Sequence, residues 1–114
     1  MMRDQSVILF TRNGMGESQG DLPLRLAGKY LSLTLQSEVL PGKILFYTDG
    51  VRLACKGSPV LEQLTELEGK GVEMVLCQTC LDTFELSSQV KVGVVGGMGD
   101  ILEALQKAEK VISL

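Results

Sequence analysis

Short apolar segments alternate with longer amphipathic segments along the whole chain, and this alternation limits the possible folds more than any other feature of the sequence. The short segments are rich in Val, Ile, Leu and Phe, and Gly, Pro or charged residues interrupt the chain between them. Such runs are typical of buried β-strands. We therefore expect strands at residues 7–10, 44–47, 72–76, 92–95 and 111–114.

The intervening segments have the apolar spacing of helices. The first helix is expected from Asp21 to about Ser37, with Asp21 as its cap and Pro23 in its first turn. Ser58 and Pro59 are expected to begin the second helix as cap and first-turn residues. Gly69 and Gly71 then end it.

Two further helices are expected nearer the carboxyl end. Thr79 is the expected cap of a short helix that contains Cys80, Leu81 and Phe84, with Asp82 at the capping-box position. The last helix is expected at residues 100–110. Strands and helices in this order form right-handed βαβ units, so we predict an α/β protein whose mainly parallel sheet is covered on both faces. With 114 residues, the chain is expected to form a single domain over residues 1–114.

The composition excludes several classes of function. Eleven basic and fourteen acidic residues give a net charge of −3, so we expect no nucleic-acid partner. The absence of histidine removes Ser-His-Asp and Cys-His catalytic pairs and every imidazole metal site. No apolar run is long enough to span a membrane, and the run at 7–10 is too short for a signal peptide. We therefore expect a cytoplasmic protein without membrane association.

The first long helix carries two apolar stripes, whereas the surface helix of a monomer needs only one. One stripe consists of Leu24, Ala27, Leu31 and Leu35. The other consists of Leu22, Leu26, Tyr30 and Leu33. Two explanations remain open: the helix is deeply buried under neighbouring loops, or its second stripe is an interface between copies of the chain.

Two of the three cysteines form a CxxC motif, Cys77-Gln78-Thr79-Cys80, where the third expected strand meets a helix. Open parallel sheets place their functional sites at this carboxyl edge. A thiol in the first turn of a helix faces unpaired backbone N–H groups, which favour the thiolate. We therefore expect Cys80 and Cys77 to be reactive, although free cysteines are often no more than small core residues.

Other uses of the thiols stay open. Zinc needs four ligands, which one copy of this chain cannot supply from its thiols. The alternative is a zinc site shared between subunits or completed by a carboxylate. We predict no resident metal. A redox pair that cycles between dithiol and disulfide also fits the motif. Cys55 lies in a predicted loop at 51–56 and is expected to be incidental, although Arg52 and Lys56 are near enough in sequence to lower its pKa.

Two glycine-rich loops follow the first and fourth expected strands, at Gly14-Met15-Gly16 and Gly96-Gly97-Met98-Gly99. Neither has the spacing of a nucleotide-binding fingerprint. Tight turns are the simpler explanation. The functional alternative is that these glycines let the backbone approach a group bound to a thiol.

These features together resemble the DsrE/DsrF-like sulfur-relay family, and most closely the DsrE-like domain of YedF-type proteins, which are described as sulfurtransferase-like and linked to selenium metabolism. The resemblance covers nearly the whole chain. Its most specific element is the segment Cys77-Gln78-Thr79-Cys80-Leu81-Asp82. The other matching segments are Met15-Gly16-Glu17, residues 40–46, residues 50–53, Gly57-Ser58, residues 67–73, and Val92-Gly93 followed by Met98.

The resemblance implies a three-layer α/β/α domain with a five-stranded parallel sheet and flavodoxin-like architecture. It implies a homo-oligomer (dimer, trimer or hexamer) in which Cys80 accepts sulfane sulfur as a persulfide and passes it to a partner protein, with Cys77 as a second thiol that resolves a persulfide or disulfide. No cofactor is required. The pocket beside the thiols is expected to be lined by Gly14, Gly16, Gly50, Thr79, Gly97 and Met98. The chain differs from the family pattern at Thr48 and Gly97, where Asn is usual, and at Gln78, where Gly is usual.

We thus expect a sulfur carrier or sulfurtransferase-like relay protein that exchanges sulfur, or selenium, with donor and acceptor proteins. Without a histidine near the thiols, no general base other than a carboxylate is evident, which favours a relay over an autonomous enzyme. The alternatives are an oligomeric binding or assembly subunit without chemistry, and a CxxC dithiol redox switch.

Overall fold

The computed structural model describes residues 2–3 and 5–114, and its centre is a five-stranded parallel sheet with the strand order β6-β5-β4-β2-β7. The strands are β2 (Ser6–Phe10), β4 (Lys43–Phe46), β5 (Glu73–Cys77), β6 (Val94–Gly96) and β7 (Lys110–Ser113). Each pairs in parallel with its neighbours. The predicted parallel α/β sheet is confirmed.

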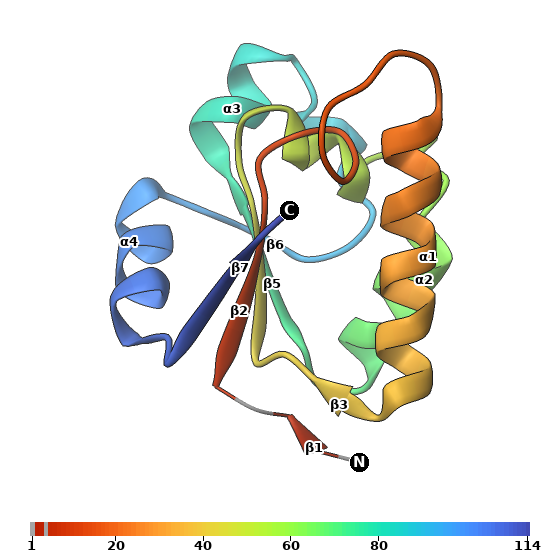
Figure 1. Ribbon diagram of the computed structural model, residues 1–114. Coiled ribbons are helices and arrows are strands. Elements are labelled where there is room, and N and C mark those ends of the chain that lie inside the picture. Colours follow the sequence, from red (N-terminus) through yellow and green to blue (C-terminus); the bar gives the residue numbers. More distant parts are fainter. Residues whose placement is uncertain (1, 4) are drawn as a thin grey trace.

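Helices cover both faces of this sheet (Figure 1). On one face, α1 (Leu22–Ser37) packs beside α2 (Leu61–Gly69). On the other face lies α4 (Met98–Lys107), and the short α3 (Gln78–Thr83) lies at the carboxyl end of the strands. The three-layer α/β/α architecture is therefore confirmed. No helix in the described part of the chain is long and apolar enough to cross a membrane.

The alternation of side chains along each strand produces two separate hydrophobic clusters. Ile8 and Phe10 of β2 pack in the cluster beneath α1 and α2, whereas Val7 and Leu9 pack beneath α4. Phe10 pairs with Phe46 in the register of β2 and β4, and their stacked rings lie 5.8 Å apart between centroids. Both rings are fully buried, so they fix the carboxyl ends of these two central strands next to each other.

Helix α1 begins after Asp21 as expected, whereas α2 begins later than expected. Val60, not Ser58, is the N-cap of α2, since the Val60 carbonyl accepts the N–H of Leu64. The Ser58 hydroxyl instead accepts the N–H of Val60 in a turn before the helix, and Pro59 precedes the helix as well. Asp21 is the N-cap of α1, but its side chain makes no capping hydrogen bond.

The predicted cap of α3 is also wrong. Cys77 is the N-cap, so Thr79 lies inside the helix, where its carbonyl accepts the hydroxyl of Thr83. With Cys77 as the N-cap, Asp82 is not at the capping-box position, and its carboxylate accepts the hydroxyl of Ser87 at 2.8 Å.

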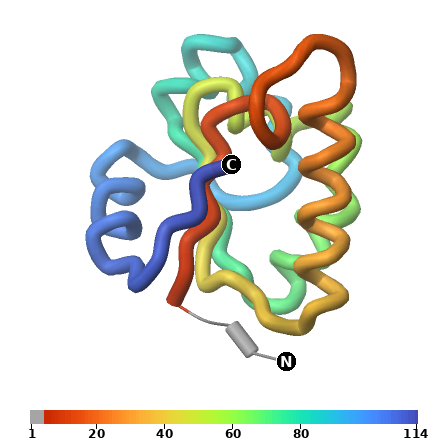
Figure 2. Tube along the Cα trace, viewed as in Figure 1, coloured from red at the N-terminus to blue at the C-terminus, as the bar shows by residue number. Residues whose placement is uncertain are grey.

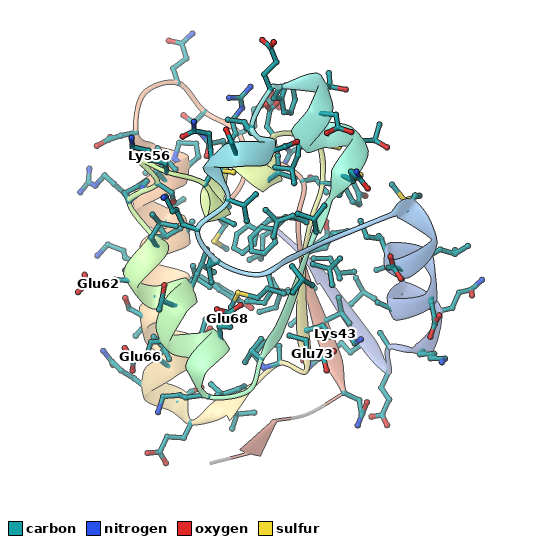
Figure 3. The ribbon with its side chains drawn as sticks, turned by 180° about the vertical axis from the view of Figure 1, so that it is seen from behind. Lys43, Lys56, Glu62, Glu66, Glu68 and Glu73 are labelled. Atoms are coloured by element: carbon teal, nitrogen blue, oxygen red, sulfur yellow. The ribbon has the colours of Figure 1, made fainter. Side chains whose placement is uncertain are left out.

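The segment around β6 and α4 is shifted along the chain. Gly93 has a φ of +86°, which breaks the extended backbone, so β6 begins at Val94 rather than at Val92. The Gly93 N–H donates to the Glu68 carboxylate at 2.8 Å, and Figure 3 shows this glutamate on α2. Helix α4 begins at Met98, where Asp100 accepts the N–H of Gly97.

Some elements were not expected from the sequence. Strands β1 (Met2–Arg3) and β3 (Val39–Leu40) form a small parallel sheet of their own. The 3₁₀-helices η1 (Thr48–Ala54) and η2 (Ser87–Gln89) occupy segments in which no helix was predicted, including most of the predicted loop at 51–56.

The two stripes of α1 have different surroundings. Ala27 and Leu31 are buried against the core, as expected for the first stripe. On the second stripe, Leu22, Leu26 and Leu33 are 45%, 39% and 62% exposed. Deep burial beneath loops within one chain therefore does not explain the second stripe.

Candidate active site

The two cysteines of the CxxC motif lie at the junction of β5 and α3, at the carboxyl edge of the sheet. Cys77 is the N-cap of α3 and is 1% exposed, packed in the cluster beneath α4. Cys80, one turn later, is partly buried and contacts both hydrophobic clusters. The predicted position of the motif is confirmed, and of the two thiols Cys80 is the more accessible.

A backbone amide from another element holds the Cys80 thiol. The N–H of Thr48 donates a hydrogen bond to Cys80 Sγ at 3.0 Å. This contact spans 32 residues of sequence and arises because β4 and β5 are neighbours, with Phe46 opposite Leu76. Thr48 has a φ of +53°, in the left-handed region that a β-branched residue rarely adopts.

Gly50 allows η1 to approach the end of β2. A Cβ atom at residue 50 would lie 2.0 Å from the carbonyl oxygen of Phe10, which is not possible without moving the backbone. The same carbonyl accepts the N–H of Tyr47 at 3.1 Å. Gly50 is buried, and its role is structural: it lets η1, which carries Thr48, pack closely against the sheet.

The surroundings of Cys80 do not favour its thiolate, contrary to the expectation from its place in the first turn of a helix. Burial raises the pKa of the Cys80 thiol, and the Thr48 N–H lowers it by a smaller amount. Direct interaction with the Cys77 side chain and the negative charge of Asp49 raise this pKa further. The net effect keeps Cys80 protonated to a higher pH than an ordinary cysteine.

Arg52 connects η1 to the segment that follows Cys80. Its Nε donates to the Asp49 carboxylate at 3.0 Å, and its guanidinium lies 4.3 Å from the centroid of the Phe84 ring. These contacts fix the acidic neighbour of Cys80 and hold η1 against the end of α3.

A polar hollow of about 570 Å³ opens beside the Thr48 amide. Thr48 and Asp49 form one wall, and the loop after β2 forms the other. Arg12 brings a positive charge to this loop wall. The sequence reasoning did not select Asp49 or the Thr48 amide as site groups, since only the folded chain brings them to the thiol. Arg12 lines the hollow, whose lining does not include Cys80.

The six predicted pocket residues lie in different places at this edge of the sheet. Gly16 lines the hollow, whereas Gly14 packs against Pro23, where an added Cβ would be 2.6 Å from that residue. Thr79 is exposed on α3, while Gly97 and Met98 lie at the start of α4. Gly50 is buried under η1. That all six residues line one pocket beside the thiols stays a prediction.

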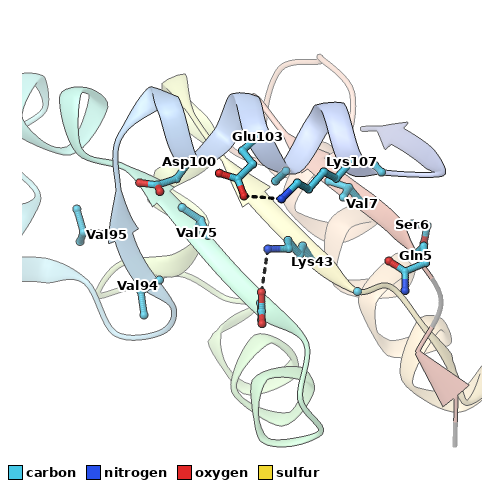
Figure 4. Close-up of a pocket in the computed structure, with 14 residues that line it drawn as sticks. Gln5, Ser6, Val7, Lys43, Val75, Val94, Val95, Asp100, Glu103 and Lys107 are labelled. Atoms are coloured by element: carbon cyan, nitrogen blue, oxygen red, sulfur yellow. Dashed lines mark hydrogen bonds and ion pairs between the residues drawn. The ribbon is translucent and has the colours of Figure 1, made fainter.

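A second hollow, of about 520 Å³, lies beneath α4 near the amino ends of β2, β4 and β5 (Figure 4). Four of its charged residues form two ion pairs: Lys43 contacts Glu73, and Lys107 contacts Glu103, each at 2.9 Å. The fifth, Asp100, accepts the N–H of Gly97. Because Cys80 follows the carboxyl end of β5, this hollow is at the opposite end of the strands from the thiols.

The third cysteine is separate from the pair. Cys55 is 2% exposed in the cluster beneath α1 and α2, and its thiol donates to the Val51 carbonyl at 3.2 Å. Burial raises its pKa, and the nearby Arg52 offsets only part of that effect. Among the described residues, no three His, Cys, Asp or Glu side chains converge to hold a metal ion.

Comparison with known proteins adds a family and a fold. The DsrE/DsrF-like family model matches residues 5–114. A search of curated proteins gave no significant match.

Among solved structures, the ychN protein of E. coli is 22% identical, with a TM-score of 0.68 over 97% of this chain and 100% of that one. MTH1491 of Methanobacterium thermoautotrophicum, described as a protein of unknown function, is 17% identical, with a TM-score of 0.70 over 97% of this chain and 100% of that one. BT1422 of Bacteroides thetaiotaomicron, a conserved protein of unknown function, is 18% identical, with a TM-score of 0.62 over 96% of this chain and 95% of that one. At these identities the similarity establishes the fold.

Proposed function

Because the chain belongs to the DsrE/DsrF-like family, we propose that it is a sulfur carrier in which Cys80 holds sulfane sulfur as a persulfide and passes it to a partner. The Cys80 thiolate attacks the outer sulfur of a donor persulfide, and the donor leaves as a thiolate. A thiolate of the acceptor then attacks the sulfur held on Cys80, which returns Cys80 to its thiolate. Selenium would follow the same steps.

The observation that carries this proposal is the hydrogen bond from the Thr48 N–H to Cys80 Sγ at 3.0 Å. A fixed amide donor stabilises negative charge on the sulfur it faces, both on a thiolate and on the inner atom of a persulfide. Partial exposure of Cys80 gives a donor access to its thiol.

The raised pKa of Cys80 also supports a relay over an autonomous enzyme. At neutral pH a small fraction of the thiol is ionised, and among the described residues whose charge acts on it the only base is the Asp49 carboxylate. A cationic donor protein seated over Cys80 would increase that fraction, so transfer would be fastest inside a donor complex. The cycle also needs free thiols, the state that a reducing cytoplasm maintains.

The test is intact-protein mass spectrometry after brief exposure to a persulfide donor, such as a cysteine desulfurase with cysteine. The wild type and the matched control Cys55→Ser should gain the mass of one sulfur atom, which a reductant removes. Cys80→Ser should gain none. If Cys80→Ser gains sulfur as readily as the wild type, the assignment of Cys80 is wrong.

We also propose that the chain forms a homo-oligomer through α1. The exposed side chains of Leu22, Leu26 and Leu33 form an apolar stripe on one helix, and such stripes are common at subunit interfaces. The same stripe favours the second candidate function, an assembly subunit without thiol chemistry. In that case Cys80 would take up no sulfur from any donor, although the oligomer would still form.

A further inference from the structure

The two thiols of the motif differ sharply in what can reach them. Cys77 is 1% exposed and packed among apolar residues beneath α4, so a donor or acceptor protein cannot reach its sulfur. Cys80 is partly exposed and packs against the same apolar cluster that contains Cys77. The buried thiol therefore has one reaction partner within reach, which is Cys80.

The geometry points to a second outcome for the bound sulfur, and we propose that Cys77 releases it as hydrosulfide by forming a disulfide with Cys80. This inference rests on the proposed function, because it starts from the Cys80 persulfide. It gives the protein an additional activity, the reductive release of sulfide, when no acceptor thiol is present.

The step balances with the groups already present. The Cys77 sulfur forms a bond to Cys80 Sγ while the bond from Sγ to the sulfane sulfur breaks. The proton of the Cys77 thiol goes to the departing sulfur, which leaves as hydrosulfide with the negative charge of the persulfide. The sulfane sulfur is reduced by two electrons, and the two cysteine sulfurs are together oxidised to a disulfide. A dithiol reductant then returns the pair to thiols.

The structure favours attack on the inner sulfur over attack on the outer one. Cys80 packs against the apolar cluster that contains the Cys77 side chain, and the Thr48 N–H holds Cys80 Sγ at 3.0 Å. Positions 77 and 80 are one helical turn apart at the start of α3, which suits two side chains that must meet.

The experiment follows the fate of the sulfur after loading. Wild type, Cys77→Ala and the matched control Cys55→Ala are loaded with glutathione persulfide, freed of donor, and kept without any acceptor thiol. Released sulfide and intact mass are measured over time. The wild type and Cys55→Ala should release one sulfide per loaded chain and become lighter than the reduced protein by two hydrogen atoms. Cys77→Ala should keep its sulfur about tenfold longer or more.

The possible results separate the two proposals. Equal rates of sulfide release from wild type and Cys77→Ala, or a wild type that keeps its sulfur and forms no disulfide, would overturn this inference and leave the carrier function standing. Failure of all three proteins to take up sulfur would overturn the carrier function and this inference with it. Cys77→Ser, loaded in the same way, shows whether the result depends on the volume lost in Cys77→Ala.

Discussion

Thr48 combines an unfavourable backbone conformation with the contact that defines the candidate site. Its φ of +53° is in the left-handed region, where a residue other than glycine loses about 1–3 kcal/mol. This conformation directs its N–H at Cys80 Sγ. The sulfur contact and the strain therefore belong to the same residue.

The first prediction concerns this strain. Asn adopts the left-handed region more readily than Thr, so Thr48→Asn should raise the free energy of unfolding by about 1 kcal/mol in urea denaturation. The backbone N–H is retained, so sulfur uptake by Cys80 should be unchanged. Thr79→Asn is the matched control, because Thr79 is exposed in α3 and has no positive φ. A loss of stability in Thr48→Asn alone would contradict the prediction.

The second prediction concerns pH. Because its pKa is raised, mainly by burial, Cys80 should be alkylated by iodoacetamide more slowly than a model thiol at neutral pH. The rate should keep rising beyond pH of about 8.5, where an ordinary cysteine is half ionised. Labelling is followed by peptide mass spectrometry in the native protein, and Cys80→Ser gives the background. A rate that reaches its plateau below that pH would show that the thiolate is favoured.

The sequence was sufficient to select the thiols and insufficient to describe their surroundings. Cys77 and Cys80 could be recognised because their spacing and their place after a strand are local features. The Thr48 amide could not, since its contact with Cys80 depends on which strands are neighbours and on a φ that Thr seldom adopts. For the same reason the predicted preference for thiolate was wrong: burial is a property of the folded chain.

Among the helices and strands, η1 is the element that completes the site, and it rests on a close contact at Gly50. The third prediction is that Gly50→Ala lowers the free energy of unfolding by about 2–3 kcal/mol, because the new Cβ would meet the Phe10 carbonyl. Since η1 must move, the Thr48 amide should also leave Cys80, and alkylation of Cys80 should change at constant pH.

The matched control for this substitution is Gly99→Ala. Gly99 lies in the first turn of α4, with no atom within 4 Å of an added Cβ, so alanine should leave the stability unchanged or raise it by up to about 1 kcal/mol. Equal effects of the two substitutions in urea denaturation would show that the contact at Phe10 is not the cause.

The strand centres and the start of α1 were predictable, and the starts of the other helices were not. Apolar runs at 7–10, 44–47 and 72–76 correspond closely to β2, β4 and β5, because burial on both faces demands such runs. Ser58 and Thr79 have the chemistry of caps, but the hydrogen bonds of the folded chain made Val60 and Cys77 the N-caps. The 3₁₀-helix η1 has no apolar periodicity that would have revealed it.

For the protein as a unit, the exposed leucines of α1 lead to the fourth prediction. Light scattering should give a mass of more than one chain for the wild type, and Leu33→Glu should shift it toward the monomer, because a charge would be buried in the interface. Since Leu33 is 62% exposed, the unfolding midpoint of a single chain should change little. Leu102→Glu, at an exposed leucine of α4, is the matched control. A wild type that is monomeric in light scattering would contradict the proposed interface at α1.

The place of β7 also determines when the sheet can be completed. β7 pairs with β2 along Ser6–Leu9, so residues near the two ends of the described chain lie side by side, as Figure 2 shows for the blue and red segments. While the protein is being synthesised, β2 can pair with β4 but keeps an open edge until Ser113 has emerged. The unpaired edge of a central apolar strand can pair with a strand of another chain. Pairing between strands that lie far apart in the sequence, such as β2 and β7, also forms slowly. Newly made chains should therefore be most prone to aggregation just before synthesis reaches β7.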